Sequence, residues 1–249
     1  MKKNNELIKR RRKKLYLRRF IVFLIFAFAI IITLALKLDA FNVKQVNING
    51  NEDISSEEII KISKIQLGSN IFLINKKDLA KNIKMNPYVS EVYIKREIPD
   101  SLNVSITERT EAYYTQCDNG FLILDKDSNV LSENSKQPNY VNFTGINTEN
   151  YEFGKALKIE NSEKINIIKE FLLLSEGNDS GLEFSSIDVE NINNLKLYIN
   201  DMCIILGNKD NLDVKLSHGI QMIIEQELLD KKGYIDVSYE GVPVYYIEK

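Results

Sequence analysis

Residues 86–109 read NPYVSEVYIKREIPDSLNVSITER, and this stretch decides how the first half of the chain is expected to fold. Apolar and polar residues alternate strictly from Leu102 to Glu108, which is typical of a strand with one buried face. The preceding run, Val89 to Ile98, also reads as a strand. Pro99 and Asp100 between the two runs favour a turn. The stretch therefore predicts two consecutive strands joined by a short connection.

A strand and a short helix are predicted upstream of this pair. Phe41–Asn49 (FNVKQVNIN) carries apolar residues at strand spacing and stops at a Gly-Asn turn. Ser55 and Glu58 form a capping box ahead of a run of isoleucines, which predicts a helix start. Gly68 is expected to supply the left-handed exit of that helix.

A second short helix is predicted between this helix and the strand pair. Asn75 can cap its start, Leu79 and Ile83 lie four residues apart on its inner face, and Pro87 enforces its end. The predicted order between residues 41 and 109 is thus β-α-α-β-β.

This segment resembles the POTRA domain of the FtsQ/DivIB family of bacterial cell division proteins. The resemblance runs through VNINGNEDISSEEI, LGSNIFLINKKDLAKNI and the stretch quoted first. The matching residues are Gly50, Asn51, Ser55, Glu57, Gly68, Asn70, Ile71, Phe72, Pro87, Tyr88, Val89, Arg96, Pro99, Leu102, Glu108 and Arg109. Glu111 departs from the family, which often has Pro after the Glu-Arg pair.

A single membrane-spanning helix is predicted near the N-terminus. Phe20–Leu36 reads FIVFLIFAFAIIITLAL without a charge, Pro or Gly. A helix of this length reaches roughly 26 Å, and Leu38 with flanking cations extends it toward a core of roughly 30 Å. A cleavable signal peptide is the rival reading, but Leu38 stands where a small residue belongs before a cut after Ala40. An uncleaved span over residues 20–38 is expected.

The charge pattern predicts the orientation of this span. Residues 1–19 hold ten cations and one anion, a net charge of +9. Since the net charge of the whole chain is −2, the remaining residues carry −11. The positive-inside bias keeps residues 1–19 in the cytoplasm and places the bulk of the chain outside, as in a type II protein. Lys9–Lys14 (KRRRKK) is expected to contact anionic lipid. Nucleic acid is not an expected partner, because the bulk of the chain is acidic.

A mixed-sheet β domain with packed helices is predicted for residues 111–249. Phe121–Leu124 and Val130–Leu131 read as a hairpin, and further strands are expected at Ser185–Val189 and Leu195–Leu206. Helices are expected over Glu163–Ser175 and in a second segment capped by Asn211 that ends near Gly233. A pair of tyrosine-rich strands around Gly241 closes the chain. With the POTRA domain at residues 39–110, the fold class is α+β.

The last pair of strands is the predicted partner-binding site. A terminal strand leaves one unpaired edge, to which another chain can add a strand. The predicted contact residues share aromatic or apolar character around a flexible turn: Tyr239, Gly241, Val242, Val244, Tyr245 and Tyr246. Internal packing of these side chains is the alternative.

The family resemblance also extends to Lys215-Leu216 and Ile235-Asp236-Val237, with Ser238 where the family usually has Arg. It implies that this end binds the small coiled-coil proteins FtsL and FtsB/DivIC.

Neither a catalytic, a cofactor-binding nor a metal site is predicted. His218 is a lone histidine and is expected on a helix surface. Cys117 and Cys203 can form a disulfide or remain two buried thiols, and the sequence favours neither.

The predicted function is that of a non-enzymatic scaffold of the divisome. By resemblance it helps to control septal peptidoglycan synthesis from the cell membrane at the division septum, with septal peptidoglycan synthase components as further partners. A POTRA chaperone of protein export and a membrane-anchored wall hydrolase are the alternatives. The first lacks visible repeats, and the second lacks a grouped pair of carboxylates in the sequence.

Overall fold

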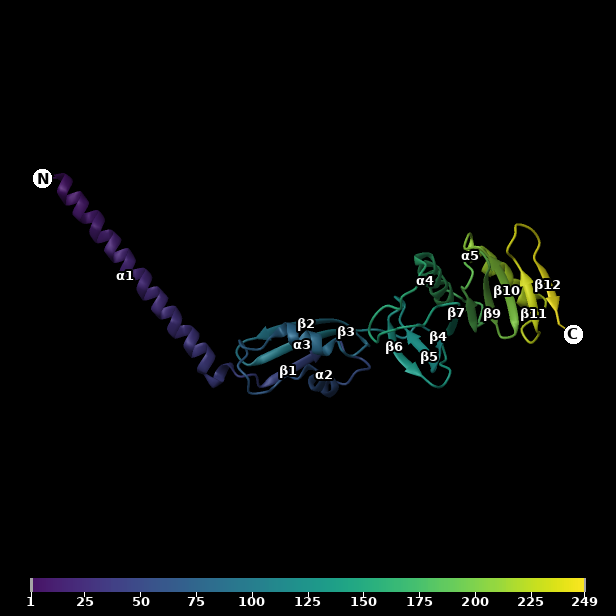
Figure 1. Ribbon diagram of the computed structural model, residues 1–249, viewed down its shortest axis with the longest axis horizontal. Helices are drawn as coiled ribbons and strands as arrows, with labels where there is room; N and C mark the ends of the chain where they lie inside the picture. The colour runs from purple at the N-terminus through teal and green to yellow at the C-terminus, as the bar shows by residue number, and fades with distance from the viewer. Residues whose placement is uncertain (1, 249) are drawn as a thin grey trace. The chain divides into compact units, whose positions relative to one another are not determined.

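The computed structural model describes residues 2–248, with side chains from Arg12 onward (Figure 1). The side chains of residues 2–11, which include three of the six predicted lipid-contacting cations, therefore lie outside the described part. The chain divides into two compact units. The first comprises Met1–Lys84 and Glu91–Thr107, and the second Met85–Ser90 and Glu108–Lys249.

The N-terminal element is the helix α1 (Lys2–Lys37). Within the described side chains, its segment Arg12–Lys37 is the one helix long and apolar enough to cross a membrane, with a mean hydropathy of 2.8 and none of its window buried in the protein. A buried core helix would instead hide such a surface. The helix fits the predicted single span and ends one residue before the predicted Leu38.

The rest of the first unit has the predicted β-α-α-β-β order. Its elements are β1 (Gln45–Asn49), α2 (Ser56–Ser63), α3 (Lys76–Ile83), β2 (Val89–Glu97) and β3 (Ser101–Glu108). The strands form one sheet in the order β1-β3-β2, with β1 parallel to β3. The alternation read from the sequence is seen in β3, where Leu102, Val104 and Ile106 are buried. The order and the fold class are confirmed.

The helix starts of this unit follow the predicted caps, but one helix end does not. The Ser55 hydroxyl accepts a hydrogen bond from the Glu58 N–H at 3.2 Å, as the capping box predicts. The predicted exit at Gly68 is wrong, because α2 ends at Ser63 and Lys64 takes the left-handed conformation, with φ of 58°. Ser63 donates to the Ile60 carbonyl and accepts from the Ile65 N–H, which closes the helix early.

Arg96, one of the family marks, holds the loop that precedes α3. Its guanidinium donates to the carbonyl oxygens of Ile71 and Ile74, both at 2.7 Å. A fixed fork of donors suits two carbonyls of one bend. Arg96 therefore stabilises the loop before α3 within the first unit. The strand β1 is shorter than predicted, since Phe41 belongs to the short helix η1 (Asp39–Phe41).

Met85–Ser90 belongs to the second unit because Arg109 ties it there. The Arg109 guanidinium donates to the carbonyls of Pro87 at 2.9 Å and Val89 at 2.7 Å. Its Nε lies 3.1 Å from the Asp125 carboxylate, in a largely buried ion pair. Removing one partner of such a pair would leave an uncompensated charge in a poorly solvated site.

The second unit is built on a nine-stranded mixed sheet. Its strands are β4 (Tyr113–Cys117), β5 (Gly120–Leu124), β6 (Val130–Asn134), β7 (Val141–Thr144), β8 (Ser186–Asp188), β9 (Leu195–Ile199), β10 (Met202–Gly207), β11 (Gly233–Asp236) and β12 (Val244–Ile247). They lie in the order β12-β11-β10-β9-β8-β7-β4-β5-β6. The two ends of this sheet are therefore β12 and β6.

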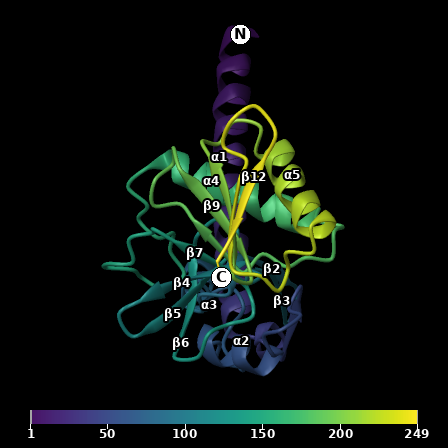
Figure 2. The same ribbon diagram turned by 90° about the vertical axis from the view of Figure 1, so that its right-hand side faces the viewer.

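Two helices, α4 (Ser162–Glu176) and α5 (Leu212–Glu225), cover one face of this sheet (Figure 2). Their buried residues, such as Phe171 and Ile223, join the inward residues of the strands in one apolar cluster. Leu197, Ile204 and Ile235 are opposite one another across β9, β10 and β11 and are all buried in that cluster. This shared burial defines the helix side of the sheet.

Several predictions for the second unit are corrected by the structure. The run Leu195–Leu206 is a hairpin of two strands, because Asn200 turns the chain with φ of 52°. Asn211 does not cap α5, since its left-handed backbone keeps the side chain away from the first N–H groups. The helix ends at Glu225, not near Gly233, which begins β11. Strands β4 and β7 were not predicted.

Candidate partner-binding site

The predicted contact residues lie on the edge strand β12 and on the loop that leads into it. Val244, Tyr245 and Tyr246 are three of the four residues of β12. Tyr239, Gly241 and Val242 lie in the connection from β11, where the Tyr239 hydroxyl donates to the Val242 carbonyl at 3.2 Å. The structure thus brings all six residues together at one end of the sheet.

One long edge of β12 has no neighbouring strand among the described residues. The Glu248 N–H donates to the Lys232 carbonyl, which marks these two opposite residues as a hydrogen-bonded pair. Since hydrogen-bonded and non-hydrogen-bonded pairs alternate in an antiparallel ladder, Tyr246 and Val244 also direct their backbone groups toward β11.

Tyr245 and Ile247 consequently direct their N–H and C=O groups away from β11, toward the open edge. The hydrogen bonds between β11 and its other neighbour, β10, agree with this alternation. The N–H groups of Gly233 and Val237 donate to β10, so the residues between them alternate in direction. Two outward donors and two outward acceptors are what a strand from another chain needs for pairing.

The side chains of β12 offer apolar surface on both faces of the sheet. Tyr245 is opposite Ile235 and shares the helix side. Tyr246 is opposite Tyr234 on the other face, where the two rings stack at a centroid distance of 5.6 Å and an angle of 29°. Exposed fractions are 54% for Val244, 42% for Tyr245 and 52% for Tyr246. These aromatic side chains are therefore exposed at the edge of the sheet rather than packed in the core.

A groove of about 310 Å³ adjoins this edge. The start of α5 forms one wall, with Val214 and His218, and the loop with Tyr239 and Gly241 forms the other. Val242, next to the groove, is 82% exposed. His218 is exposed on the surface of α5, as predicted. The loop residues therefore extend the edge strand into a concave surface.

Two contributors to the site were missed by the sequence reading. Tyr234 was not included although it stacks on Tyr246, and Ile247 was not included although its backbone faces the open edge. The YIDV string shows that Tyr234 precedes a strand core, but only the register with β12 places it beside Tyr246. Ser238, where the family usually has Arg, bonds back to the Asp236 carboxylate through its N–H and hydroxyl.

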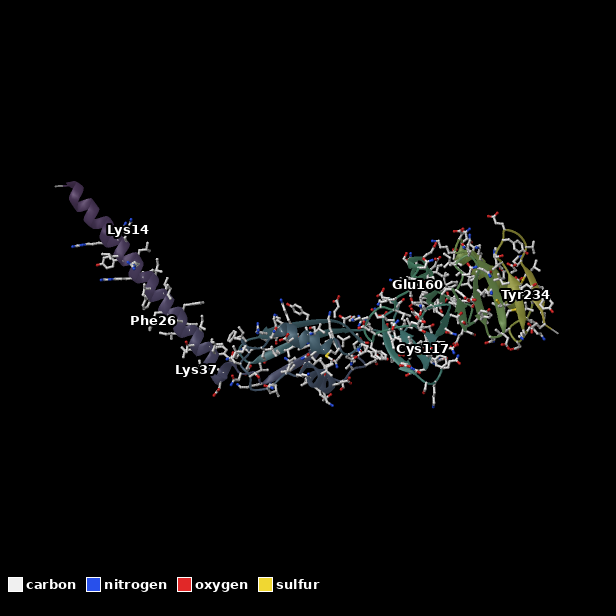
Figure 3. All side chains as sticks on the ribbon, in the orientation of Figure 1. Lys14, Phe26, Lys37, Cys117, Glu160 and Tyr234 are labelled. Carbon is white, nitrogen blue, oxygen red and sulfur yellow. The ribbon has the colours of Figure 1, made fainter. Side chains whose placement is uncertain are left out.

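The two cysteines are free thiols. Cys117 lies on β4 and Cys203 on β10, four strand spacings apart in the sheet order, and Figure 3 shows Cys117 well away from Tyr234, which is opposite Cys203. At roughly 4.8 Å per spacing they are about 19 Å apart, far beyond the span of a disulfide. Burial raises the pKa of the Cys203 thiol. Both thiols are reduced, as in the second of the two readings left open, but they are half-buried rather than buried.

Comparison with known proteins places these features in a family. The family model described as POTRA domain, FtsQ-type, matches residues 41–109. The cell division protein DivIB of Clostridium botulinum (strain Hall) is 37% identical over 248 residues, which cover 98% of this chain and 97% of the relative. DivIB of Clostridium acetobutylicum is 34% identical over the full length of both chains. DivIB of Bacillus subtilis is 25% identical, covering 97% and 88%.

Fold and comparisons together define a class of protein in which one apolar helix precedes an FtsQ-type POTRA domain and a second domain built on a mixed sheet. The full-length similarity to DivIB goes further than the domain match. The chain belongs to the FtsQ/DivIB family of bacterial cell division proteins. The resemblance read from the sequence is confirmed.

Proposed function

We propose that this protein is a non-enzymatic scaffold of the divisome that captures a small coiled-coil division protein of the FtsL or FtsB/DivIC type through the open edge of β12. In this role it helps to control septal peptidoglycan synthesis. The observation that carries the proposal is the direction of the backbone groups along β12. Those of Val244 and Tyr246 point toward β11, so the N–H and C=O groups of Tyr245 and Ile247 are available for an added strand.

The surrounding side chains support capture of a polypeptide rather than catalysis. The groove beside β12 carries one histidine, and no group of three or more His, Cys, Asp or Glu able to hold a metal is found among the described residues. Aromatic rings at the edge supply contact area at low conformational cost. Backbone pairing then supplies affinity, and the side chains of Tyr245 and Tyr246 supply register on the two faces.

The orientation follows from the N-terminal helix and its charges. The cationic tail remains in the cytoplasm, and the POTRA domain and the nine-stranded sheet lie outside. A reporter enzyme fused after Lys249 should be active only outside the cytoplasm. Activity of a cytoplasmic reporter at the same position would contradict this orientation.

The edge-pairing proposal is tested by moving proline along β12. Tyr245→Pro removes an outward N–H, whereas Tyr245→Ala removes the ring and keeps the N–H. One lost backbone hydrogen bond is worth about 1 kcal/mol, so Tyr245→Pro should bind the partner about fivefold more weakly than Tyr245→Ala, or worse if the strand cannot dock. The measurement is the dissociation constant between the full chain in nanodiscs and the soluble segment of an FtsB/DivIC-type protein.

Val244→Pro is the matched variant, because the Val244 backbone points toward β11 and not toward the open edge. Its N–H faces Asp236 of β11, so this change should lower the stability of the edge as well as the affinity. Thermal unfolding followed by circular dichroism separates the two effects. Equal affinities of Tyr245→Pro and Tyr245→Ala would contradict strand addition, and any capture would then depend on side chains alone.

A further inference from the structure

A second surface of the same unit lies on the helix side of the sheet, in the groove between α4 and α5. This groove has a volume of about 480 Å³. One wall follows α5 along nearly its whole length, through Asp213, Ser217, Ile220 and Ile224, which recur at helical spacing. The other wall is the end of α4 and the loop after it. Figure 2 shows the two helices on the same side of the sheet.

The floor of the groove is apolar. Leu216 is buried, Ile220 and Leu174 are partly buried, and Ile224 is 53% exposed. The partly buried Ile220 and the exposed Ile224, one helical turn apart, leave hydrocarbon in contact with water beside the buried Leu216. Contact with an apolar stripe would remove that surface from water.

The charged residues that line the groove are all acidic. Asp179, Asp213 and Glu225 line it, and no lysine or arginine does. None of these three carboxylates is paired with a cation in the part of the chain that the structure describes. The last turn of α4, which ends in the groove, also lacks a basic residue, so its C-terminal dipole adds to the negative potential.

We propose that this groove binds an amphipathic helix of a partner protein, one with an apolar stripe at i, i+3, i+4 and i+7 flanked by Lys and Arg. The apolar stripe fits the floor of Leu216, Ile220 and Ile224, and the flanking cations fit the carboxylates of the rim. An acidic helix meets like charge on both rims, and an extended peptide leaves the floor along α5 only partly covered. This surface is distinct from the open edge of β12.

The test uses the full chain in zwitterionic phosphatidylcholine nanodiscs and three labelled 14-residue helical peptides. The first has the apolar stripe flanked by Lys, the second has Glu in place of Lys, and the third has the Lys residues with the stripe scrambled. Fluorescence anisotropy, corrected with empty nanodiscs, should show saturable binding of the first peptide only. The affinity should fall as salt is raised, because the rim charges are exposed.

Matched variants assign the binding to the groove. Removal of two rim charges with Asp213→Asn and Glu225→Gln should weaken binding of the first peptide at least about fivefold. Removal of two carboxylates elsewhere on the same unit, with Asp118→Asn and Glu149→Gln, changes the net charge equally and should leave the affinity within twofold. Ile224→Ser should also weaken binding, and Tyr245→Pro on the edge strand should not.

A photo-crosslinking residue in place of Gln221 then identifies the protein that occupies the groove in growing cells. Mass spectrometry of the crosslinked segment should find an amphipathic helix rich in Lys or Arg. Equal binding of all three peptides, insensitivity to the groove variants, or an acidic or extended crosslinked segment would overturn the proposal. These outcomes leave capture at β12 untouched, so the two proposals fail separately.

Discussion

The two ends of the nine-stranded sheet are treated differently by the chain. At one end, the first residue of β6 is covered by the protein's own backbone: Val130 donates to the Lys155 carbonyl and accepts from the Gly154 N–H, at 3.0 and 2.8 Å. At the other end, β12 has no such cover among the described residues. We call these the closed edge and the open edge.

The side chains follow the same contrast. Val130 and Leu131 on the closed edge are 0% and 2% exposed, whereas Val244, Tyr245 and Tyr246 on the open edge are each more than 40% exposed. Proteins protect free strand edges because unprotected ones recruit other chains. The contrast between a protected edge and an exposed aromatic edge supports the proposed capture of a partner at the open edge.

The largest expected effect comes from breaking the cover of the closed edge. Val130→Pro removes the N–H that bonds to Lys155 and also part of a buried side chain, which should cost about 2–4 kcal/mol in the free energy of unfolding. Urea unfolding of the full chain measures this cost. Partner affinity per folded molecule should be unchanged, in contrast to Tyr245→Pro, which should weaken binding and spare stability. A stable Val130→Pro protein would show that the closed edge does not depend on this cover.

A pair of glycines next to the two edges sharpens the comparison. Gly233 begins β11, and a Cβ there would lie 2.0 Å from the Tyr246 carbonyl oxygen on the open edge. Gly120 begins β5, and a Cβ there would lie 2.3 Å from the Asn134 carbonyl oxygen on the closed edge. Each Gly→Ala change should displace its edge strand and cost about 1–3 kcal/mol of stability.

Only one of the two changes should affect binding. Gly233→Ala should reduce partner capture, because it moves the strand that pairs with the partner, and Gly120→Ala should not. Paired measurements of urea midpoints and dissociation constants on both variants check this. If both variants lost affinity equally, the binding site would not be confined to the open edge.

The parts of the fold that were predicted correctly are those set by interactions between residues close in the sequence. The first unit was predicted well because its signals are short-range: the Ser55 hydroxyl caps α2, and the residues of β3 alternate. In the second unit, Leu195–Leu206 is one apolar run, and its division into two strands depends on a single left-handed residue, Asn200. Asn211 was misread because Asn suits both a cap and a left-handed bend, and the chain uses the second.

The site was predictable in composition but not in geometry. Tyrosines and valines near the end of the chain identify β12 as a candidate edge, and the structure places it there. Whether Val244 or Tyr245 faces the partner depends on the register with β11, which long-range pairing sets. The same register places Tyr234 beside Tyr246. The groove between α4 and α5 has no short-range signal at all.

Aromatic pairs at the two edges should give a smaller effect. Tyr234 stacks on Tyr246 at the open edge, and Phe153 packs edge-on against Tyr151 near the closed edge, both at 5.6 Å between centroids. A double-mutant cycle of Tyr234→Ala and Tyr246→Ala should give a coupling energy of about 0.5–1.5 kcal/mol in unfolding. Tyr234→Ala should also weaken partner capture, whereas Phe153→Ala should leave capture unchanged; the reverse pattern would contradict the assignment of the edges.

The smallest expected effect is a loss of stability at alkaline pH that arises beside the closed edge. Burial, together with the hydrogen bond that the Tyr88 hydroxyl donates to Glu111 at 2.6 Å, raises the pKa of Tyr88 to about 12. Because this folded-state pKa lies above the ordinary value of 10.0, the folded protein holds the proton more tightly than the unfolded chain does. The stabilisation is therefore complete below pH 10 and is lost as the pH rises toward 12.

Tyr88→Phe should remove this part of the pH dependence, so the melting temperature of the variant should fall less steeply than that of the parent between pH 10 and 12. Glu111→Gln keeps the tyrosine and removes the carboxylate that raises its pKa, and should give an intermediate slope. Melting curves at half-unit steps of pH measure both slopes. Identical slopes in all three proteins would show that Glu111, which stands where the family often has Pro, does not stabilise the protonated tyrosine beside the closed edge.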